Sequence, residues 1–405
     1  MRISPFTALH PRPELAQRVA APPYDTVNTA EARQLAQGEP WSLLHVSRPE
    51  IDMPDGADPH ADEAYAHAAA TFRRFLDAGV IERDSGERIY VYRQRMGDHV
   101  QHGVVACCHV RDYATGVVRV HEKTRADKEE DRTRHILALR AQVGPALLTH
   151  RDNTRVDQLT AETEKAAPMM EVSSPDGVTH TIWRVPDPAA FVTAFHDIPT
   201  AYIADGHHRC AAAVRAAREL AARASTQIPD ASSQWFLTVL FPSSQLRIMP
   251  YNRCVKDLNG RTPEAFLAEV ARIFRVTPDA APSPDRPRTC SMYLAGRWYG
   301  LAWDLPPGSD PMASLDVSVL QDRVLAPLLG IDDPRTSKRI DFVGGIRGTG
   351  ELVRHVDGGA MAVAFSMHPV TVDQMMAIAD AGGIMPPKST WFEPKLRSGL
   401  LMHAI

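Results

Sequence analysis

Cysteine is scarce in this sequence, and its spacing excludes several classes of small cross-linked domain. Five cysteines occur among 405 residues, and none forms a C-x-x-C pair. They are Cys107, Cys108, Cys210, Cys254 and Cys290. An odd number of scattered cysteines argues against a disulfide scaffold or a zinc knuckle and is typical of reduced thiols in the cytosol.

Long hydrophobic runs are also missing. No window approaches the length needed to cross a bilayer. The N-terminal stretch "MRISPFTALHPRPELAQ" lacks the apolar centre of a signal peptide. We therefore expect a cytoplasmic protein that makes no membrane contact.

Neither sign of charge dominates the chain. The formal net charge is −4, and we find no helix-turn-helix with a basic recognition face, so nucleic acid is not an expected partner. Hydrophobic residues make up 44% of the chain, which is enough for the cores of two or three domains. The oligomeric state is left open.

Common catalytic fingerprints are absent. The sequence contains no H-E-x-x-H, no G-x-S-x-G and no metal-spaced cysteine and histidine set. The glycine-rich stretch "DFVGGIRGTGEL" (341–352) has no Lys-Thr after its glycines, so it matches no phosphate-binding loop. We interpret it as a connection between a strand and a helix, and the metal ligands stay unassigned.

Composition and periodicity divide the chain into three parts, which together predict a mixed α/β (α+β) protein. These are an N-terminal segment (1–84), a core (85–255) and a C-terminal α/β domain (256–405). We expect helices over 28–38, 61–81, 126–144, 262–274, 313–331 and 371–382, and the helix over 313–331 is expected to be broken before Pro327. We expect strands over 88–96, 102–113, 145–150, 201–205, 235–242 and 359–367, and hairpins over 170–185 and 289–303.

The stretch "AYIADGHHRCAAAV" (201–214) is the strongest functional signal. Asp205 and Gly206 end an apolar strand, and His207, His208 and Arg209 open an alanine-rich helix. The unpaired N–H groups of a helix start attract anions, and a guanidinium contacts phosphate oxygens in bidentate fashion. We interpret these five residues as a phosphate-binding turn. The alternative is a capped helix with solvated histidines.

A second polar group, "HEKT" (121–124), follows the strand-like "GVVRV" and precedes a charged helix. A carboxylate at a strand end near a phosphate site can accept a proton from a hydroxyl. We therefore select Glu122 and its neighbour His121 as candidate catalytic residues, with Thr124 beside them as a cofactor-binding candidate. The alternative is a solvated charge run.

Two further segments could hold or cover a ligand. Tyr24 and Asp25 lie on the stiff "APPYDTV" backbone, which suits ligand holding and structural turns equally. The tail "MPPKSTWFEPKLRSGL" (385–400) combines basic and aromatic residues, and we select Lys388 and Ser389 as substrate-binding or lid residues.

Several motifs together resemble the family called domain of unknown function 1015, along essentially the full chain. The carriers are "APPYD" (21–25), "LLHVSRPEID" (43–52), "HEKT" (121–124), "ADGHHR" (204–209), "LDVSVLQD" (315–322), "DFVGGIRG" (341–348) and "PPKSTWFEPKLRSGL" (386–400).

"DGHHR" between a strand and a helix is also similar to the signature of the ParB/sulfiredoxin superfamily, whose members bind nucleotide phosphates at this turn. Within it, free serine kinases pair "DGHHR" with an upstream His-Glu whose glutamate is taken as the base. The resemblance implies a ParB/sulfiredoxin-like core in 85–255, with His121 and Glu122 as the matching pair. The longer interval here implies an insertion over 151–190.

The function that the resemblance implies is a small-molecule kinase that transfers phosphate from ATP or ADP, with Mg²⁺, to a hydroxyl such as that of free serine. Glu122 would be the base, Asp205 would orient the turn or touch magnesium, and His207, His208 and Arg209 would hold phosphate. The main alternative is a non-catalytic, ParB-like nucleotide switch. Sulfiredoxin-like repair would require a cysteine where His207 stands, and a ligand-binding protein without catalysis is the fourth option.

Overall fold

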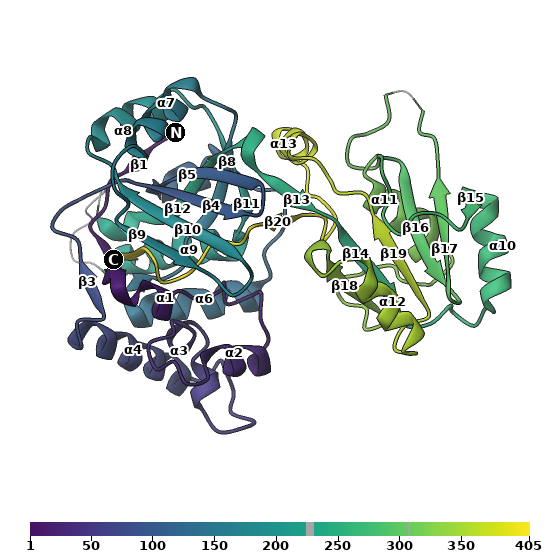
Figure 1. Cartoon of the computed structure of the whole chain (residues 1–405), viewed down its shortest axis with the longest axis horizontal. Helices are drawn as coiled ribbons and strands as arrows, with labels where there is room; N and C mark the ends of the chain where they lie inside the picture. Colours follow the sequence, from purple (N-terminus) through teal and green to yellow (C-terminus); the bar gives the residue numbers. More distant parts are fainter. Residues whose placement is uncertain (224–230, 307) are drawn as a thin grey trace. The chain divides into compact units, whose positions relative to one another are not determined.

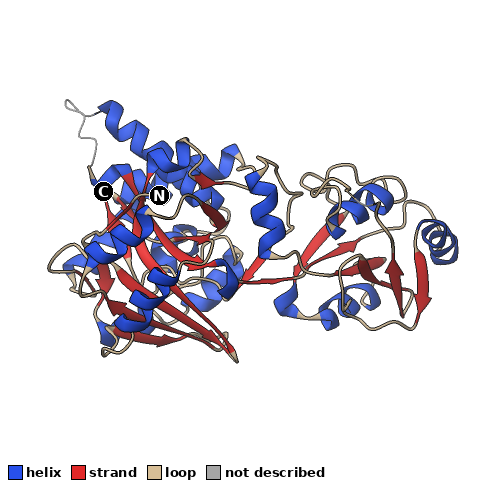
Figure 2. Ribbon diagram, turned by 90° about the horizontal axis from the view of Figure 1, so that it is seen from above, coloured by secondary structure: helices blue, strands red, loops and turns tan. Residues whose placement is uncertain are grey.

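The contacts of the chain divide it into two units. The computed structural model describes residues 1–223, 231–306 and 308–405. Unit 1 comprises Met1–Leu246 and Pro394–Ile405, and unit 2 comprises Arg247–Glu393. Both units contain helices and strands, as the mixed α/β prediction requires (Figure 2). This division differs from the three parts expected above, because residues 1–84 pack within unit 1 and the last residues return to it.

A nine-stranded sheet forms the centre of unit 1 (Figure 1). Its order is β6-β11-β8-β12-β5-β4-β10-β9, and β1 also pairs with β5. The strands are β1 (Ile3–Ser4), β4 (Tyr90–Met96), β5 (His99–His109), β6 (Val118–Arg119), β8 (Ala146–His150), β9 (Met170–Ser173), β10 (Val178–Arg184), β11 (Ala201–Asp205) and β12 (Trp235–Pro242). β6 with β11 and β8 with β12 are parallel, and the other pairs are antiparallel.

A smaller sheet of unit 1 brings distant segments together in the order β3-β2-β21-β7. Its strands are β2 (Ala8–Pro11), β3 (Ile81–Arg83), β7 (Ala141–Gln142) and β21 (Met402–Ala404). The helices of unit 1 are α1 (Ala16–Val19), α2 (Thr29–Ala36), α3 (Leu44–Ser47), α4 (Asp62–Asp77), α5 (Val110–Ala114), α6 (Ala126–Leu139), α7 (Thr154–Thr163), α8 (Pro188–His196) and α9 (His207–Arg223).

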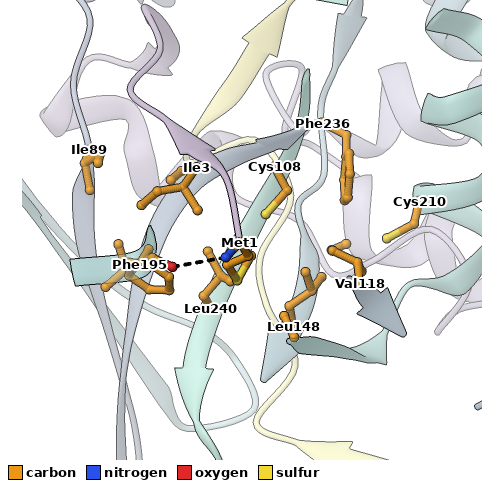
Figure 3. Packing of buried hydrophobic residues seen from close by; sticks show 14 of the residues in the cluster. Met1, Ile3, Ile89, Cys108, Val118, Leu148, Phe195, Cys210, Phe236 and Leu240 are labelled. Atoms are coloured by element: carbon orange, nitrogen blue, oxygen red, sulfur yellow. Dashed lines mark hydrogen bonds between the residues drawn. The ribbon is translucent and has the colours of Figure 1, made fainter. Parts of the chain in front are cut away.

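Alternate residues of the central strands build the main hydrophobic cluster (Figure 3). The residues alternate because side chains two residues apart lie on the same face of a strand. Cys108 of β5 and Phe236 of β12 both belong to the cluster. Helix α9 adds Cys210 and a row of alanines, whose small side chains let the helix approach the sheet closely. Met1 is buried among these residues, and its amino group donates to the carbonyl of Phe195 at 3.3 Å.

Unit 2 is built on a six-stranded sheet with the order β15-β17-β16-β19-β14-β18. These strands are β14 (Tyr251–Val255), β15 (Arg275–Pro278), β16 (Thr289–Leu294), β17 (Arg297–Ala302), β18 (Ile340–Gly344) and β19 (Val363–Met367), and β13 (Arg247–Met249) pairs with β20 (Trp391–Glu393). Its helices are α10 (Pro263–Ile273), α11 (Asp316–Leu320), α12 (Thr349–Asp357) and α13 (Val372–Asp380). Leu352 of α12 packs with Cys254, Tyr293 and Val343 of the sheet.

Most of the local elements expected from the sequence are confirmed. The two hairpins form as β9–β10 and β16–β17, and the strand over 201–205 leads directly into α9. Several predicted ends are wrong. The helix expected over 61–81 stops at Asp77, because Ile81 pairs with Pro11 of β2 as part of β3. The helix expected over 313–331 is an α-helix only over Asp316–Leu320 and continues as a π-helix over Gln321–Leu325. The helix expected over 126–144 stops at Leu139, because Arg140 takes a left-handed conformation (φ 55°) and β7 then pairs with β21. The strand expected over 102–113 ends at His109, whose side chain caps α5.

Residues 224–230, between α9 and β12 in the sequence, lie outside the described part of the chain. Among the described helices, none combines the length and the apolar character that crossing a bilayer would require.

Candidate functional site

The DGHHR turn lies where β11 meets α9. Asp205 is the last residue of β11, Gly206 has φ +95°, and His207 begins α9. Glycine tolerates this backbone angle, whereas other residues are strained by it. A Cβ at position 206 would also lie 2.9 Å from the Nε of Arg209. Position 206 therefore requires glycine both for its backbone angle and for the space that Arg209 takes.

Two cations flank the carboxylate of Asp205. Arg209 contacts Oδ2 at 2.9 Å, and Lys395 lies 3.7 Å from Oδ1. Burial by itself would raise the pKa of Asp205, but Lys395 and Arg209 outweigh it and lower the pKa to about 2. Arg209 donates as well to the backbone carbonyl of Pro145. Through its contacts with Asp205 and Pro145, the guanidinium of Arg209 holds the turn in place within unit 1.

Both histidines of the turn contact the segment that carries Glu122. The N–H of Arg125 donates to Nε2 of His208 at 3.0 Å. The N–H of His121 makes a longer contact, 3.5 Å, with Nε2 of His207, and the rings of His121 and His207 meet edge to face. The imidazoles of the turn therefore tie residues 121–125 to the start of α9.

The imidazoles here are uncharged at neutral pH. Burial lowers the pKa of His121 to about 4, although a hydrogen bond with the backbone of Ile203 acts to raise it. Burial and the neighbouring His121 hold the pKa of His207 well below the usual histidine range, and burial also lowers that of His208. Neutral imidazoles suit acceptor and metal-ligand roles better than the neutralisation of phosphate charge.

Three side chains of the site form a set that could hold a metal ion. One ligand atom each from His121, Glu122 and His207 lies within 4.8 Å of the other two. His121 is 2% exposed and His207 6% exposed, while Glu122 is partly exposed. His121 and His207 are 86 positions apart in the sequence, and the set matches no common ligand spacing, so the sequence alone does not assign these metal ligands.

Tyr24 and Asp25 lie close enough to the turn to interact electrostatically with Arg209, and their role in holding a ligand stays a prediction. The guanidinium of Arg132 stacks on the Tyr24 ring at 4.0 Å, and burial raises the pKa of the Tyr24 phenol. The negative charge of Asp25 opposes the lowering of the His208 pKa by burial and also acts on Arg209.

A cavity of about 50 Å³ adjoins Arg209 on the side of Tyr24. Its lining includes Tyr24, Arg132, Gly144, Arg209 and Ser398. Sites for drug-sized ligands usually measure ~300 Å³ or more. The cavity is therefore too small, as it stands, to enclose a nucleotide.

The other predicted residues make different contacts. Thr124 donates to Glu129 of α6 at 3.1 Å. Lys388 and Ser389 belong to unit 2, where the Nζ of Lys388 lies 5.5 Å from the Tyr251 ring centroid and Ser389 donates to the carbonyl of Pro386. Their role as lid residues stays a prediction.

Lys395 is the residue of the site that the selection from the sequence missed. It stands seven positions after Lys388 in the same basic tail. Gln94 donates to the carbonyl of Lys395 at 2.9 Å, and Gln101 donates to Gln94. Only this long-range pairing reveals which lysine reaches Asp205.

The family model described as "Protein of unknown function (DUF1015)" matches residues 3–318. The chain belongs to this family. No curated protein matches the chain.

Among solved structures, the DUF1015 chain is similar to a truncated SbnI from Staphylococcus aureus, with 12% identity and a TM-score of 0.40 over 74% of this chain and 87% of that one. It is similar to a free serine kinase in complex with AMP, with 12% identity and a TM-score of 0.37 over 74% and 92%. A conserved hypothetical protein from Pyrococcus furiosus gives 12% identity and a TM-score of 0.36 over 74% and 95%.

Proposed function

We propose that this DUF1015 protein is a nucleotide-dependent kinase that phosphorylates a hydroxyl of a small molecule. The observation that supports it is the pairing of two segments distant in sequence. The loop that carries Glu122 is hydrogen-bonded to His208 of the DGHHR turn through the N–H of Arg125. A candidate base and a candidate phosphate-binding turn thus share one site, in which a ParB/sulfiredoxin-like core would lie within unit 1.

In this proposal, a carboxylate oxygen of Glu122 takes the proton of the acceptor hydroxyl. The hydroxyl oxygen then bonds to the terminal phosphorus of ATP or ADP, and the bond from that phosphorus to the bridging oxygen breaks. The leaving group is ADP or AMP, respectively. Free serine is one acceptor to test.

The remaining residues would position the nucleotide. Asp205 orients the turn, because each of its two oxygens faces a cation, Arg209 or Lys395. This arrangement fits magnesium binding by Asp205 less well. Mg²⁺, which neutralises the charge of the transferred phosphate, would instead arrive with the nucleotide. Lys395 and the N–H groups at the start of α9 would face the phosphate oxygens.

The decisive experiment combines turnover and binding. The purified protein is incubated with Mg²⁺, ATP or ADP and a panel of hydroxylated metabolites that includes serine, and phosphorylated product is measured. Glu122→Gln should lower turnover by about 10²–10⁴-fold while nucleotide affinity stays within about twofold. Glu162→Gln, at an exposed position of α7, is the matched control and should change neither.

The outcomes separate the candidate functions. Nucleotide binding without any product would favour the non-catalytic switch. No binding of either nucleotide at millimolar concentration would overturn both functions. Unchanged turnover in Glu122→Gln would show that another residue takes the proton.

A further inference from the structure

His121, Glu122 and His207 converge from two separate segments. The first two follow β6, and the third begins α9. One ligand atom from each lies within 4.8 Å of the others. Ligand atoms around one ion, each bound at about 2.0–2.2 Å, lie about 3–4 Å apart, so small side-chain adjustments would bring these atoms onto a single ion.

The donor set determines which ions fit. Two imidazoles and one carboxylate suit zinc, manganese, iron(II), cobalt or nickel. Magnesium and calcium prefer a shell made of oxygen atoms. Three protein ligands also leave at least one coordination position for water or a bound ligand.

The surroundings hold the ligands in place. The ring of His121 is hydrogen-bonded to the backbone of Ile203, a partner of the kind that orients metal-bound histidines. The N–H of Arg125 is bound to His208, which restrains the segment that carries two of the three ligands. Both imidazoles are buried, so little solvent competes with an ion there.

We propose that His121, Glu122 and His207 bind one divalent transition-metal ion, with an open position that faces the DGHHR turn. This inference does not rest on the proposed kinase activity. The metal site is compatible with the kinase activity, because coordination through one oxygen of Glu122 leaves the other oxygen free to accept a proton.

The test uses the full chain, freed of metal by dialysis against a chelator and titrated with Co²⁺ while visible absorption is recorded. We expect one equivalent to bind with bands stronger than those of aqueous Co²⁺, and Zn²⁺ but not a large excess of Mg²⁺ to displace it. His207→Gln and Glu122→Gln should weaken binding at least about 10-fold. A spectrum identical to that of aqueous Co²⁺ in the wild type would overturn the proposal without any variant.

A control addresses other histidines. His45 and His67 both contact Asp52, at 2.8 and 3.2 Å, and offer a different imidazole-carboxylate group in unit 1. His67→Gln should leave Co²⁺ binding unchanged. If His67→Gln abolished binding and a folded His207→Gln did not, the ion would sit elsewhere and the proposal would be wrong. Nucleotide binding, measured separately with Mg²⁺ alone, tests the kinase proposal independently.

Discussion

The side chain of His208 accepts a hydrogen bond from the backbone N–H of Arg125 at 3.0 Å. This bond joins the first turn of α9 to the loop between β6 and α6. It makes the position of the candidate base Glu122 dependent on a residue of the phosphate turn.

Replacing His208 with alanine should release that loop. Because the N–H of Arg125 loses its acceptor, we expect amide hydrogen exchange over residues 121–125 to accelerate, while exchange in the middle of α6 stays unchanged. Hydrogen-exchange mass spectrometry measures this directly. His208→Gln, which keeps an acceptor, should exchange at an intermediate rate, and equal rates in all three proteins would contradict the prediction.

Asp205→Asn should destabilise unit 1 by about 2 kcal/mol at neutral pH. The substitution removes the carboxylate charge that Arg209 and Lys395 share, and these two cations, with side chains 11% and 14% exposed, are then left without an anion. The pKa of Asp205 is lowered to about 2 in the folded state, below its unfolded value near 4. The stabilisation is therefore present above pH 4 and is lost as pH falls toward 2.

Urea unfolding of the wild type and Asp205→Asn at pH 6 and pH 3 checks both parts. The difference in unfolding free energy should shrink at the lower pH. A difference that is the same at both pH values would rule out the ion-pair explanation.

His135 predicts a second, separate pH dependence. Burial, with the charge of Arg132, lowers the pKa of His135 to about 4, and its Nε2 lies 2.8 Å from the carbonyl of Val46. In the unfolded chain His135 has its ordinary pKa near 6.5 and takes up a proton below that pH, whereas in the folded protein it stays neutral down to about pH 4. The contribution of this group to the free energy of unfolding is therefore complete above pH 6.5 and falls as pH drops from 6.5 to 4. The expected loss from this group is about 3 kcal/mol.

His135→Gln keeps an N–H donor for Val46 but removes the titration. Its unfolding free energy should depend less on pH between 6.5 and 4 than that of the wild type. The comparison concerns the slope, so a constant loss of stability from the substitution does not affect it. Parallel slopes would refute the assignment.

Gly206→Ala should cost more stability than a comparable glycine substitution elsewhere. Gly116 also has a positive φ, +76°, but nothing lies within 4 Å of where its Cβ would be. Both substitutions strain the backbone, whereas only the one at 206 pushes Arg209 from Asp205. We expect an extra loss of about 1–3 kcal/mol, measured by urea unfolding. Equal losses would mean that Arg209 moves without cost.

The local parts of the fold and the site were predictable from sequence. The β11–turn–α9 motif was found because its signals are contiguous, an apolar run, Asp-Gly and an alanine-rich segment. The helix near residue 30 was found for the same reason, and Asn28 and Glu31 form its capping box. The position of such elements can be predicted because it depends on residues that are close together in the sequence.

The features that the sequence did not reveal depend on distant partners. No local signal distinguishes Lys395 from Lys388, because the choice depends on Gln94 holding the backbone of the tail. The end of α6 at Leu139 likewise depends on β7 pairing with β21, a strand near the other end of the chain. Residues 121 and 207 meet only after the sheet has formed, so spacing alone could not reveal their shared ligand set.

The return of the chain to unit 1 at Pro394 has a consequence for biosynthesis. β2 and β7 are synthesised before unit 2, yet the strand that joins them, β21, is synthesised only after it. At translation rates of about 5–20 residues per second the wait is on the order of tens of seconds, during which both strands lack this partner. A nascent chain stalled within unit 2 should therefore be far more sensitive to protease in unit 1 than the finished protein.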